Sequence, residues 1–271
     1  EIGVRLVGSE MCIRDSFQWS SSISYTHNDE KIVDLPDGDL IAKKLFEGHP
    51  IKTFYDFKYA GIWSTAEEEE AAKYGCQPGY VKIETVEQFT TDENGNLVGD
   101  GGVHTYSNTR DLQILGSNVP DGILGVNNTF KYRDFDLSVF AIVRYGQMID
   151  SKTIGWYSAN GNNQPRGTNY WTPENQSAYF PRPGIASTTG IGSLKYIDGS
   201  YAKIKNITLG YTFPKKLCKT LGLEQCRLYA TAYNVFVLPF KSELKHSDPE
   251  NNGSDTFPLY KTYLLGLNVS F

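Results

Sequence analysis

The stretch Gly122–Tyr145, GILGVNNTFKYRDFDLSVFAIVRY, carries the clearest pattern in the chain. Apolar side chains recur with a period of two on both sides of Asp134, with a gap at Asn128: Leu124, Val126, Phe130 and Tyr132, then Phe135, Leu137, Val139, Ala141, Val143 and Tyr145. Successive side chains of a β-strand point to opposite faces, so this period predicts two strands with one apolar face each. The tight break at Asp134 predicts that they form a hairpin.

The same period of two appears in three further blocks: Phe17–Thr26, Ile207–Phe213 and Tyr263–Phe271. Ile204 is out of phase with the second of them, which predicts a β-bulge near Lys205. The block Cys226–Phe236 mixes small and aromatic residues on both faces, so its inward side stays open.

The connections between these blocks alternate in length. Two are short, around Asp134 and over Pro214–Gln225, and three are long, Thr26–Asp121, Gly146–Ser200 and Pro239–Tyr260. A soluble β-sandwich gives the same alternation, but compact domains seldom carry loops beyond about 15 residues. Short turns on one side and long extracellular loops on the other are typical of membrane barrels. We therefore predict an all-β chain, the C-terminal part of a transmembrane antiparallel β-barrel.

The composition of the 271 residues limits the function classes. The net charge is −5 without a basic stripe, which argues against a nucleic-acid partner. The chain has no apolar run near the roughly 18 residues of a spanning helix, whereas 13% aromatic residues suit the girdles of a barrel in lipid.

Residues Glu1–Ser16 lack a signal-peptide pattern and do not alternate. We interpret them as non-native and residues 17–271 as the barrel segment.

Residues of the types that commonly take part in catalysis are scattered along the chain. The four histidines are isolated, and Asp248 and Glu250 flank Pro249 on one loop, so these carboxylates cannot face each other across a glycosidic bond. Asp92, Asn94 and Asn96 have the spacing of a calcium loop, but no Gly and no closing Glu follow at the required positions, which favours a plain polar turn. We predict no enzyme activity, no catalytic residue, no metal site and no cofactor.

Two local features concern the loops and turns. Thr65 with Glu68 predicts a capping box that opens a short helix over Ala66–Tyr74. Cys218 and Cys226 flank one turn and could pair in an oxidising periplasm; two free thiols are the alternative.

Several motifs, in their order and spacing, are similar to the SusC/RagA type of TonB-linked outer-membrane proteins. These are EGHPIKTFYDFKYAGIW (Glu47–Trp63), Leu115–Gly146, YWTPENQSAYFPRP (Tyr170–Pro183), SYAKIKNITLGYTFPKKL (Ser200–Leu217), RLYATAYNVF (Arg227–Phe236), DPE (Asp248–Glu250) and the final YLLGLNVSF. The resemblance implies a 22-stranded barrel, of which six to eight strands are present here.

The resemblance also implies energy-coupled import of oligosaccharides or peptides across the Gram-negative outer membrane. The partners would be membrane lipid, a SusD-like lipoprotein and, through the missing N-terminal region, the TonB complex. The outward residues of the last strand resemble the signal read by the barrel assembly machinery: Tyr263, Leu265, Leu267, Val269 and Phe271. A passive porin-like channel and a secreted carbohydrate-binding β protein are the alternatives.

Six aromatic residues in the connection after Tyr145 are candidate ligand contacts: Trp156, Tyr157, Tyr170, Trp171, Tyr179 and Phe180. Flat rings offer large contact areas to a sugar or a peptide at low entropic cost. Packing of the loops against the barrel rim is the alternative for each of them.

Overall fold

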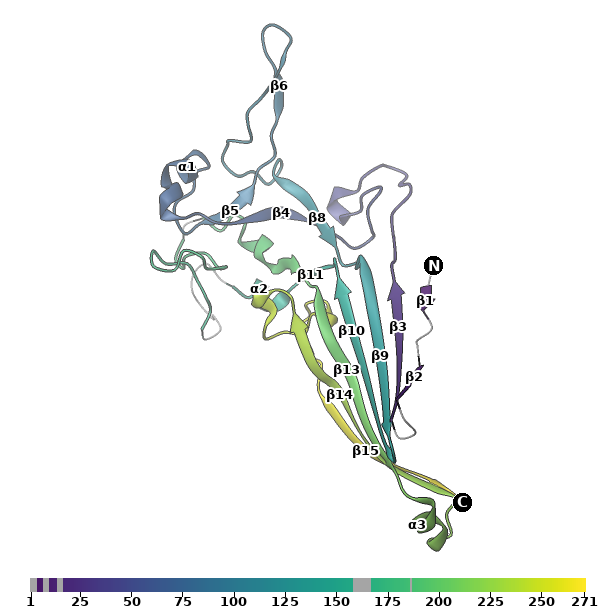
Figure 1. The fold of residues 1–271 in the computed structure, drawn as a ribbon. Helices are drawn as coiled ribbons and strands as arrows, with labels where there is room; N and C mark the ends of the chain where they lie inside the picture. The colour runs from purple at the N-terminus through teal and green to yellow at the C-terminus, as the bar shows by residue number, and fades with distance from the viewer. Residues whose placement is uncertain (1–3, 7–9, 14–16, 158–166, 186) are drawn as a thin grey trace.

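The alternating blocks form one antiparallel sheet, as the sequence predicts (Figure 1). Its strands follow in the order β3 (Phe17–Thr26), β9 (Gly122–Tyr132), β10 (Phe135–Tyr145), β13 (Tyr201–Thr212), β14 (Gln225–Pro239) and β15 (Thr262–Ser270). The computed structural model describes residues 4–6, 10–13, 17–157, 167–185 and 187–271. Two short strands, β1 (Val4–Leu6) and β2 (Glu10–Ile13), pair with the outer edge of β3. The sheet is open in the part of the chain that the structure describes.

The register aligns the apolar positions of all six long strands on one face. One row of directly paired residues crosses the whole sheet: Phe17, Tyr132, Phe135, Tyr211, Leu228 and Leu267. A second row crosses from β3 to β14: Ile23, Val126, Ala141, Ile204 and Phe236. Because side chains of paired residues lie on the same face, these rows belong to one largely apolar surface, interrupted by the Ser21–Asn128 pair, that no described element covers.

The opposite face of the sheet is polar. Its row next to the short turns consists of Gln18, Lys131, Asp136, Gly210, Tyr229 and Gly266. Further along, the hydroxyl groups of Thr208 and Thr231 lie 2.9 Å apart across β13 and β14. Tyr229 and Thr231 therefore point to the polar face, which settles the orientation of the block Cys226–Phe236 that the sequence left open.

The predicted bulge lies at Lys205. Phe140 pairs with Asn206 and Ala141 with Ile204, so Lys205 has no partner on β10. The extra residue keeps Ile204 on the apolar face although it is out of phase with Ile207, and the prediction from the sequence is confirmed.

The long connections all leave one end of the sheet, and the short turns lie at the other (Figure 1). A two-residue turn, Arg133–Asp134, joins β9 to β10, and helix α3 (Lys215–Thr220) lies between β13 and β14. The C-terminus lies at this end as well.

The long loops carry secondary structure of their own. Strands β5 (Val81–Glu84), β4 (Thr53–Ile62) and β8 (Leu112–Ser117) form a small sheet, β6 (Phe89–Thr91) and β7 (Leu97–Gly99) a hairpin, and β11 (Met148–Asp150) pairs with β12 (Tyr196–Asp198). The helical segments are η1 (Ile41–Lys43), η2 (Thr65–Glu67), α1 (Glu68–Lys73), α2 (Lys152–Gly155), η3 (Ile191–Lys195), η4 (Ser242–Leu244) and η5 (Pro249–Asn251). Among the described helices, none has the length and apolar character needed to cross a membrane.

The buried core lies in this loop layer. Three clusters of buried apolar residues surround Trp63, Ile149 and Phe57, and none of their members comes from the six long strands. The loops thus pack as a folded layer on the end of the sheet, while the sheet has one apolar and one polar face.

The predicted loop helix is present, but its capping box consists of Ser64 and Glu67, one residue before the predicted Thr65 and Glu68. Ser64, not Thr65, precedes the first turn, and the Ser64 N–H donates to Glu67 Oε2 over 3.1 Å. A 3-10 turn then leads into α1, and Gly75 follows with a φ of 70°. The observed box and the predicted one differ by one position, which depends on the backbone conformation of Ser64.

Candidate ligand-binding surface of the long loops

Four of the six candidate aromatic residues are part of the packing of the loop layer. The Tyr157 ring stacks on Phe180 with 4.7 Å between centroids, and its hydroxyl donates to the Pro181 carbonyl over 2.5 Å. Burial raises the pKa of Tyr157 to about 12. A ring that is stacked and hydrogen-bonded inside the layer holds loop segments together.

Trp171 and Tyr179 have similar positions. Trp171 is 2% exposed and lies so close to Gly79 that a Cβ there would be 2.9 Å from the indole Cε3 atom. The Tyr179 hydroxyl donates to the Leu194 carbonyl over 2.5 Å. Trp171 and Tyr179 thus pack inside the loop layer, which is the alternative to ligand binding. Contact of these two rings with a ligand stays a prediction.

Trp156 and Tyr170 are exposed, at 54% and 44% respectively. Trp156 borders a pocket of about 480 Å³ between α2, the upper end of β14 and the β14–β15 loop. Its indole N–H donates to Asp255 Oδ2 over 3.0 Å, which fixes the ring at the pocket wall. Lys245 and Lys261 line the same pocket. An exposed ring beside charges of both signs suits a polar oligomer with a flat or apolar face.

The loop that lines this pocket is tied to the sheet by buried ion pairs. Lys203 of β13 is 2% exposed, and its Nζ lies 2.5 Å from both Asp248 Oδ2 and Glu250 Oε2. Lys205, the bulged residue, also pairs with Glu250. Burial raises the pKa of Glu250, but hydrogen bonds from Lys203 and Lys205 outweigh it and hold this pKa below its ordinary value. Removing one partner of such a cluster leaves an uncompensated buried charge.

Asp248 and Glu250 have a role that the sequence did not predict. They bind Lys203, 45 and 47 residues away. The sequence shows a lysine on the polar face of a strand and an acidic pair in a later loop. No local pattern indicates that these residues contact each other.

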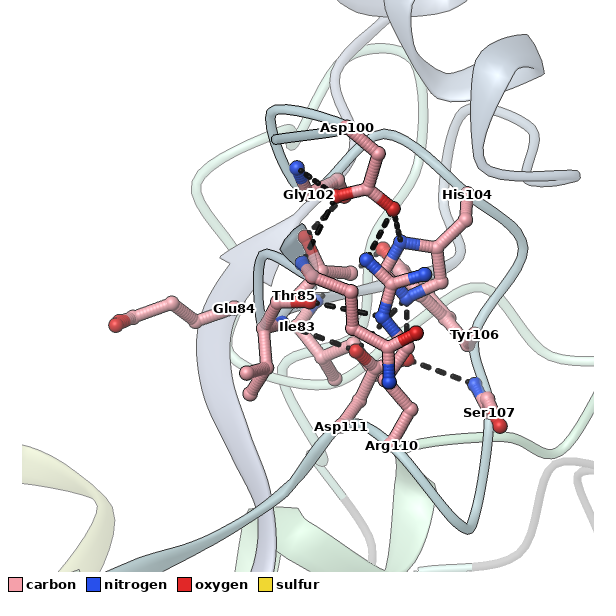
Figure 2. Close-up of polar contacts among 12 residues, drawn as sticks. Ile83, Glu84, Thr85, Asp100, Gly102, His104, Tyr106, Ser107, Arg110 and Asp111 are labelled. Carbon is pink, nitrogen blue, oxygen red and sulfur yellow. Dashed lines mark hydrogen bonds and ion pairs between the residues drawn. The ribbon is translucent and has the colours of Figure 1, made fainter. Parts of the chain in front are cut away.

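A second polar network fixes the base of the β6–β7 hairpin (Figure 2). Asp111 is fully buried; its carboxylate lies 2.9 Å from His104 Nε2 and accepts the backbone N–H of Val86 and Ser107. Arg110 donates through Nε to the Val86 carbonyl over 2.9 Å and through Nη2 to Asp100.

In this network the Arg110 guanidinium, followed by backbone donors, holds the pKa of Asp100 far below its ordinary value. Backbone groups fill most of the hydrogen-bonding positions of the carboxylates. The network therefore orients loop backbone, and His104, isolated in the sequence, is one of its members.

Asp92, Asn94 and Asn96, which have the spacing of a calcium loop, form the turn at the tip of the β6–β7 hairpin. Asp92 Oδ1 accepts the backbone N–H of Asn94 and of Asn96, each over 2.8 Å. These hydrogen bonds lower the pKa of Asp92, and the bond from Asn96 has the largest effect. The carboxylate is used within the turn, as the plain-turn interpretation predicts, and no group of three metal-ligating side chains occurs among the described residues.

Cys218 and Cys226 are free thiols in the structure, so the disulfide alternative does not describe it. Cys218 is buried, and its Sγ donates to the Phe213 carbonyl over 3.6 Å. Cys226 lies in β14 opposite Val269.

The last strand, β15, pairs with β14 on one side and with no described strand on the other. Tyr263, Leu265, Leu267 and Val269 are exposed on the apolar face, and Phe271 follows the strand. This is an open edge with apolar outward residues, and its role in barrel assembly stays a prediction.

Comparison with known proteins gives a consistent result, although no family model matches the chain. The chain is 26% identical to TonB-dependent receptor P3 of Formosa agariphila, with 98% of this chain and 28% of the receptor aligned. It is 28% identical to receptor P26 of the same organism, and 25% identical to TonB-dependent receptor SusC of Bacteroides thetaiotaomicron, over 27% and 26% of their lengths. The chain therefore spans about a quarter of the curated relatives it matches.

Solved structures agree at the level of the fold. The RagAB peptide transporter superposes with a TM-score of 0.71 at 20% identity, over 97% of this chain and 28% of that chain. The RagAB peptide importer in its closed-closed state gives 0.67 at 21% identity. The resemblance to SusC/RagA-type proteins is thereby confirmed: the chain is similar to TonB-dependent receptors in sequence and has the fold of a segment of the RagAB transporter.

Proposed function

We propose that residues 17–271 form the C-terminal part of the wall of an outer-membrane, TonB-dependent importer, and that Glu1–Ser16 is a non-native extension. The observation that carries this proposal is the apolar face that runs in register from β3 to β15. In water such a face is unfavourable, whereas in a bilayer it meets lipid. The strand lengths of 9 to 15 residues suit a tilted crossing, which needs about 9 to 11.

The polar face would then line the lumen, and the loop layer would face the outside of the cell. We propose that the imported ligands are oligosaccharides or peptides, that a SusD-like lipoprotein covers the loops, and that TonB acts on the part of the receptor not contained in this chain. The sequence similarity to TonB-dependent receptor SusC supports the TonB assignment, and the fold shared with the RagAB peptide transporter supports peptides as one ligand class. The Trp156 pocket is the proposed contact within the loops.

The open edge of the sheet at β15 also fits this proposal. An unclosed barrel leaves backbone groups unpaired at both edges, which lipid does not tolerate. We propose that β15 pairs with a strand from the missing part of the receptor and that its outward residues are read by the barrel assembly machinery.

The test is to recover the intact gene with its neighbours and to express the full-length protein. We expect the intact gene to encode a plug domain and a TonB box and to lie next to a SusD-like gene. The expressed protein should show heat-modifiable migration in the outer-membrane fraction. A barrel without plug or TonB box would favour a passive channel instead. A product that stays soluble without detergent would overturn the barrel altogether.

A further inference from the structure

A second pocket of about 480 Å³ lies where the three long connections meet. The β3–β9 connection contributes Lys43, Lys44 and Lys52, the β10–β13 connection Asp150 and Tyr196, and the β14–β15 connection Asn252. A site built from all three loops is positioned by the whole loop layer and not by one mobile segment.

The charges around this pocket are unbalanced. Its one lining carboxylate, Asp150, is already bound by two lysines outside the lining: Lys152 Nζ at 2.6 Å and Lys195 Nζ at 3.8 Å. In the described part of the chain, the three lining lysines form no salt bridge. In a chain of net charge −5, this locally cationic cleft attracts anions.

The backbone conformation of Lys44 in this pocket is fixed. Its backbone has φ 56° and ψ 39°, a left-handed conformation that costs a residue with a side chain roughly 1–2 kcal/mol. The Leu40–Leu45 bridge, with N–O distances of 2.9 and 3.2 Å, encloses the turn that imposes it. The Lys44 ammonium lies 5.9 Å from the centroid of the Tyr196 ring. Backbone strain of this kind recurs at ligand sites, where the surrounding structure compensates for it.

We propose that this pocket binds the carboxylate or sulfate groups of an acidic oligosaccharide. The inference rests on the import function proposed above and names the substrate class. Lysine is a flexible point charge, which suits anionic groups at variable spacing along a sugar chain. Thr53 and Phe54 already pair with β8, and Asp150 pairs with Tyr196. Recognition therefore depends on side-chain charge more than on the backbone pairing used by extended peptides.

The test uses the purified full-length receptor in detergent and isothermal titration with four probes: hexagalacturonate, a chondroitin sulfate hexasaccharide, maltohexaose and hexaglutamate. At least one of the two acidic sugars should bind more tightly than maltohexaose. Its affinity should fall at least about tenfold between about 50 and about 300 mM salt, because screening weakens exposed charge pairs. Comparing the two acidic sugars shows whether carboxylate or sulfate is preferred.

The double variant Lys44→Gln, Lys52→Gln should weaken binding of that sugar about tenfold or more. The control is Lys73→Gln on α1, whose ammonium pairs with Glu70 at 2.5 Å; it should bind like the wild type. Heat-modifiable migration checks that each variant folds, and the salt dependence of the wild type tests the proposal without any variant. Unchanged binding by the double variant, equal affinity for maltohexaose or a preference for hexaglutamate would overturn it. Failure of TonB-dependent uptake with intact binding would count against the import function alone.

Discussion

Arg227 of β14 binds Asp136 of β10 across the strand between them, with 3.0 Å from Nε to Oδ1 and 2.5 Å from Nη2 to Oδ2. The pair crosses β13 at Gly210. A Cβ on this residue would collide with Arg227 Nη2 and Asp136 Oδ1. The missing side chain therefore admits a two-bond contact between strands that are not neighbours, and this contact ties three strands together on the polar face.

Gly210→Ala should separate this ion pair and lower the free energy of unfolding by about 1.5–3 kcal/mol, the usual range for hydrogen bonds to charged groups. Thermal unfolding of the full-length barrel measures the effect. The matched control is Gly192→Ala, because a Cβ at Gly192 meets no atom within 4 Å. Equal melting of both variants and the wild type would show that the pair contributes nothing to stability.

Lys203→Met should free the β14–β15 loop while the sheet stays folded. The variant leaves Asp248 and Glu250 without their buried partner, and the two carboxylates would then move toward water. Limited trypsin digestion should cut faster at Lys241, Lys245 and Lys261. Lys58→Met, which breaks an exposed pair with Glu84, should leave the rate unchanged. A Lys203→Met protein as resistant as the wild type would contradict the anchoring role.

The same anchor should have a defined pH dependence. Since the pKa of Glu250 is held below its ordinary value of 4.5 in the folded loop, its pairing adds stability that is complete above pH 4.5 and is lost as the pH falls through the lowered pKa. Hydrogen exchange of residues 247–255, corrected for intrinsic rates, should therefore stay slow down to pH 4.5 and accelerate only below it. In Glu250→Gln the part of this acceleration due to Glu250 should be absent. Acceleration that begins well above pH 4.5 in the wild type would contradict this assignment.

Local patterns explain which features the sequence could predict. The hairpin Gly122–Tyr145 and the bulge at Lys205 follow from a period of two and from its shift at Ile204, and both can be read within one strand. The inward face of β14 could not be predicted, because Tyr229 and Leu228 are both acceptable on either face. Only pairing with β13 and β15 decides between them.

The candidate site was less predictable for the same reason. Trp171 and Trp156 look alike in sequence, but one is packed against Gly79 and the other is exposed. The difference depends on contacts between loops that are far apart in the chain, as does the pairing of Lys203 with Asp248.

Alanine substitutions should separate these two tryptophans. Trp171→Ala removes a buried ring and should cost about 3–5 kcal/mol of stability, seen as a lower melting temperature. Trp156→Ala should leave melting unchanged and weaken binding of the imported oligomer by about 1–2 kcal/mol. Titration calorimetry on both variants measures the second effect. If Trp156→Ala binds like the wild type, Trp156 is not a ligand contact.

Neighbouring residues of β10 provide a direct test of which face meets lipid. Val139 lies near the middle of the strand on the apolar face, opposite Asn128 and Ile207, and Ser138 lies next to it on the polar face. In a bilayer, Val139→Arg should cost about 2–4 kcal/mol because the guanidinium sits at the depth of the hydrocarbon, whereas Ser138→Arg faces water. Assembly in the outer membrane, followed by heat-modifiable migration, should therefore fail or decline for Val139→Arg alone. The opposite order would place lipid on the polar face, and equal assembly of both variants would mean that neither face is buried in a membrane.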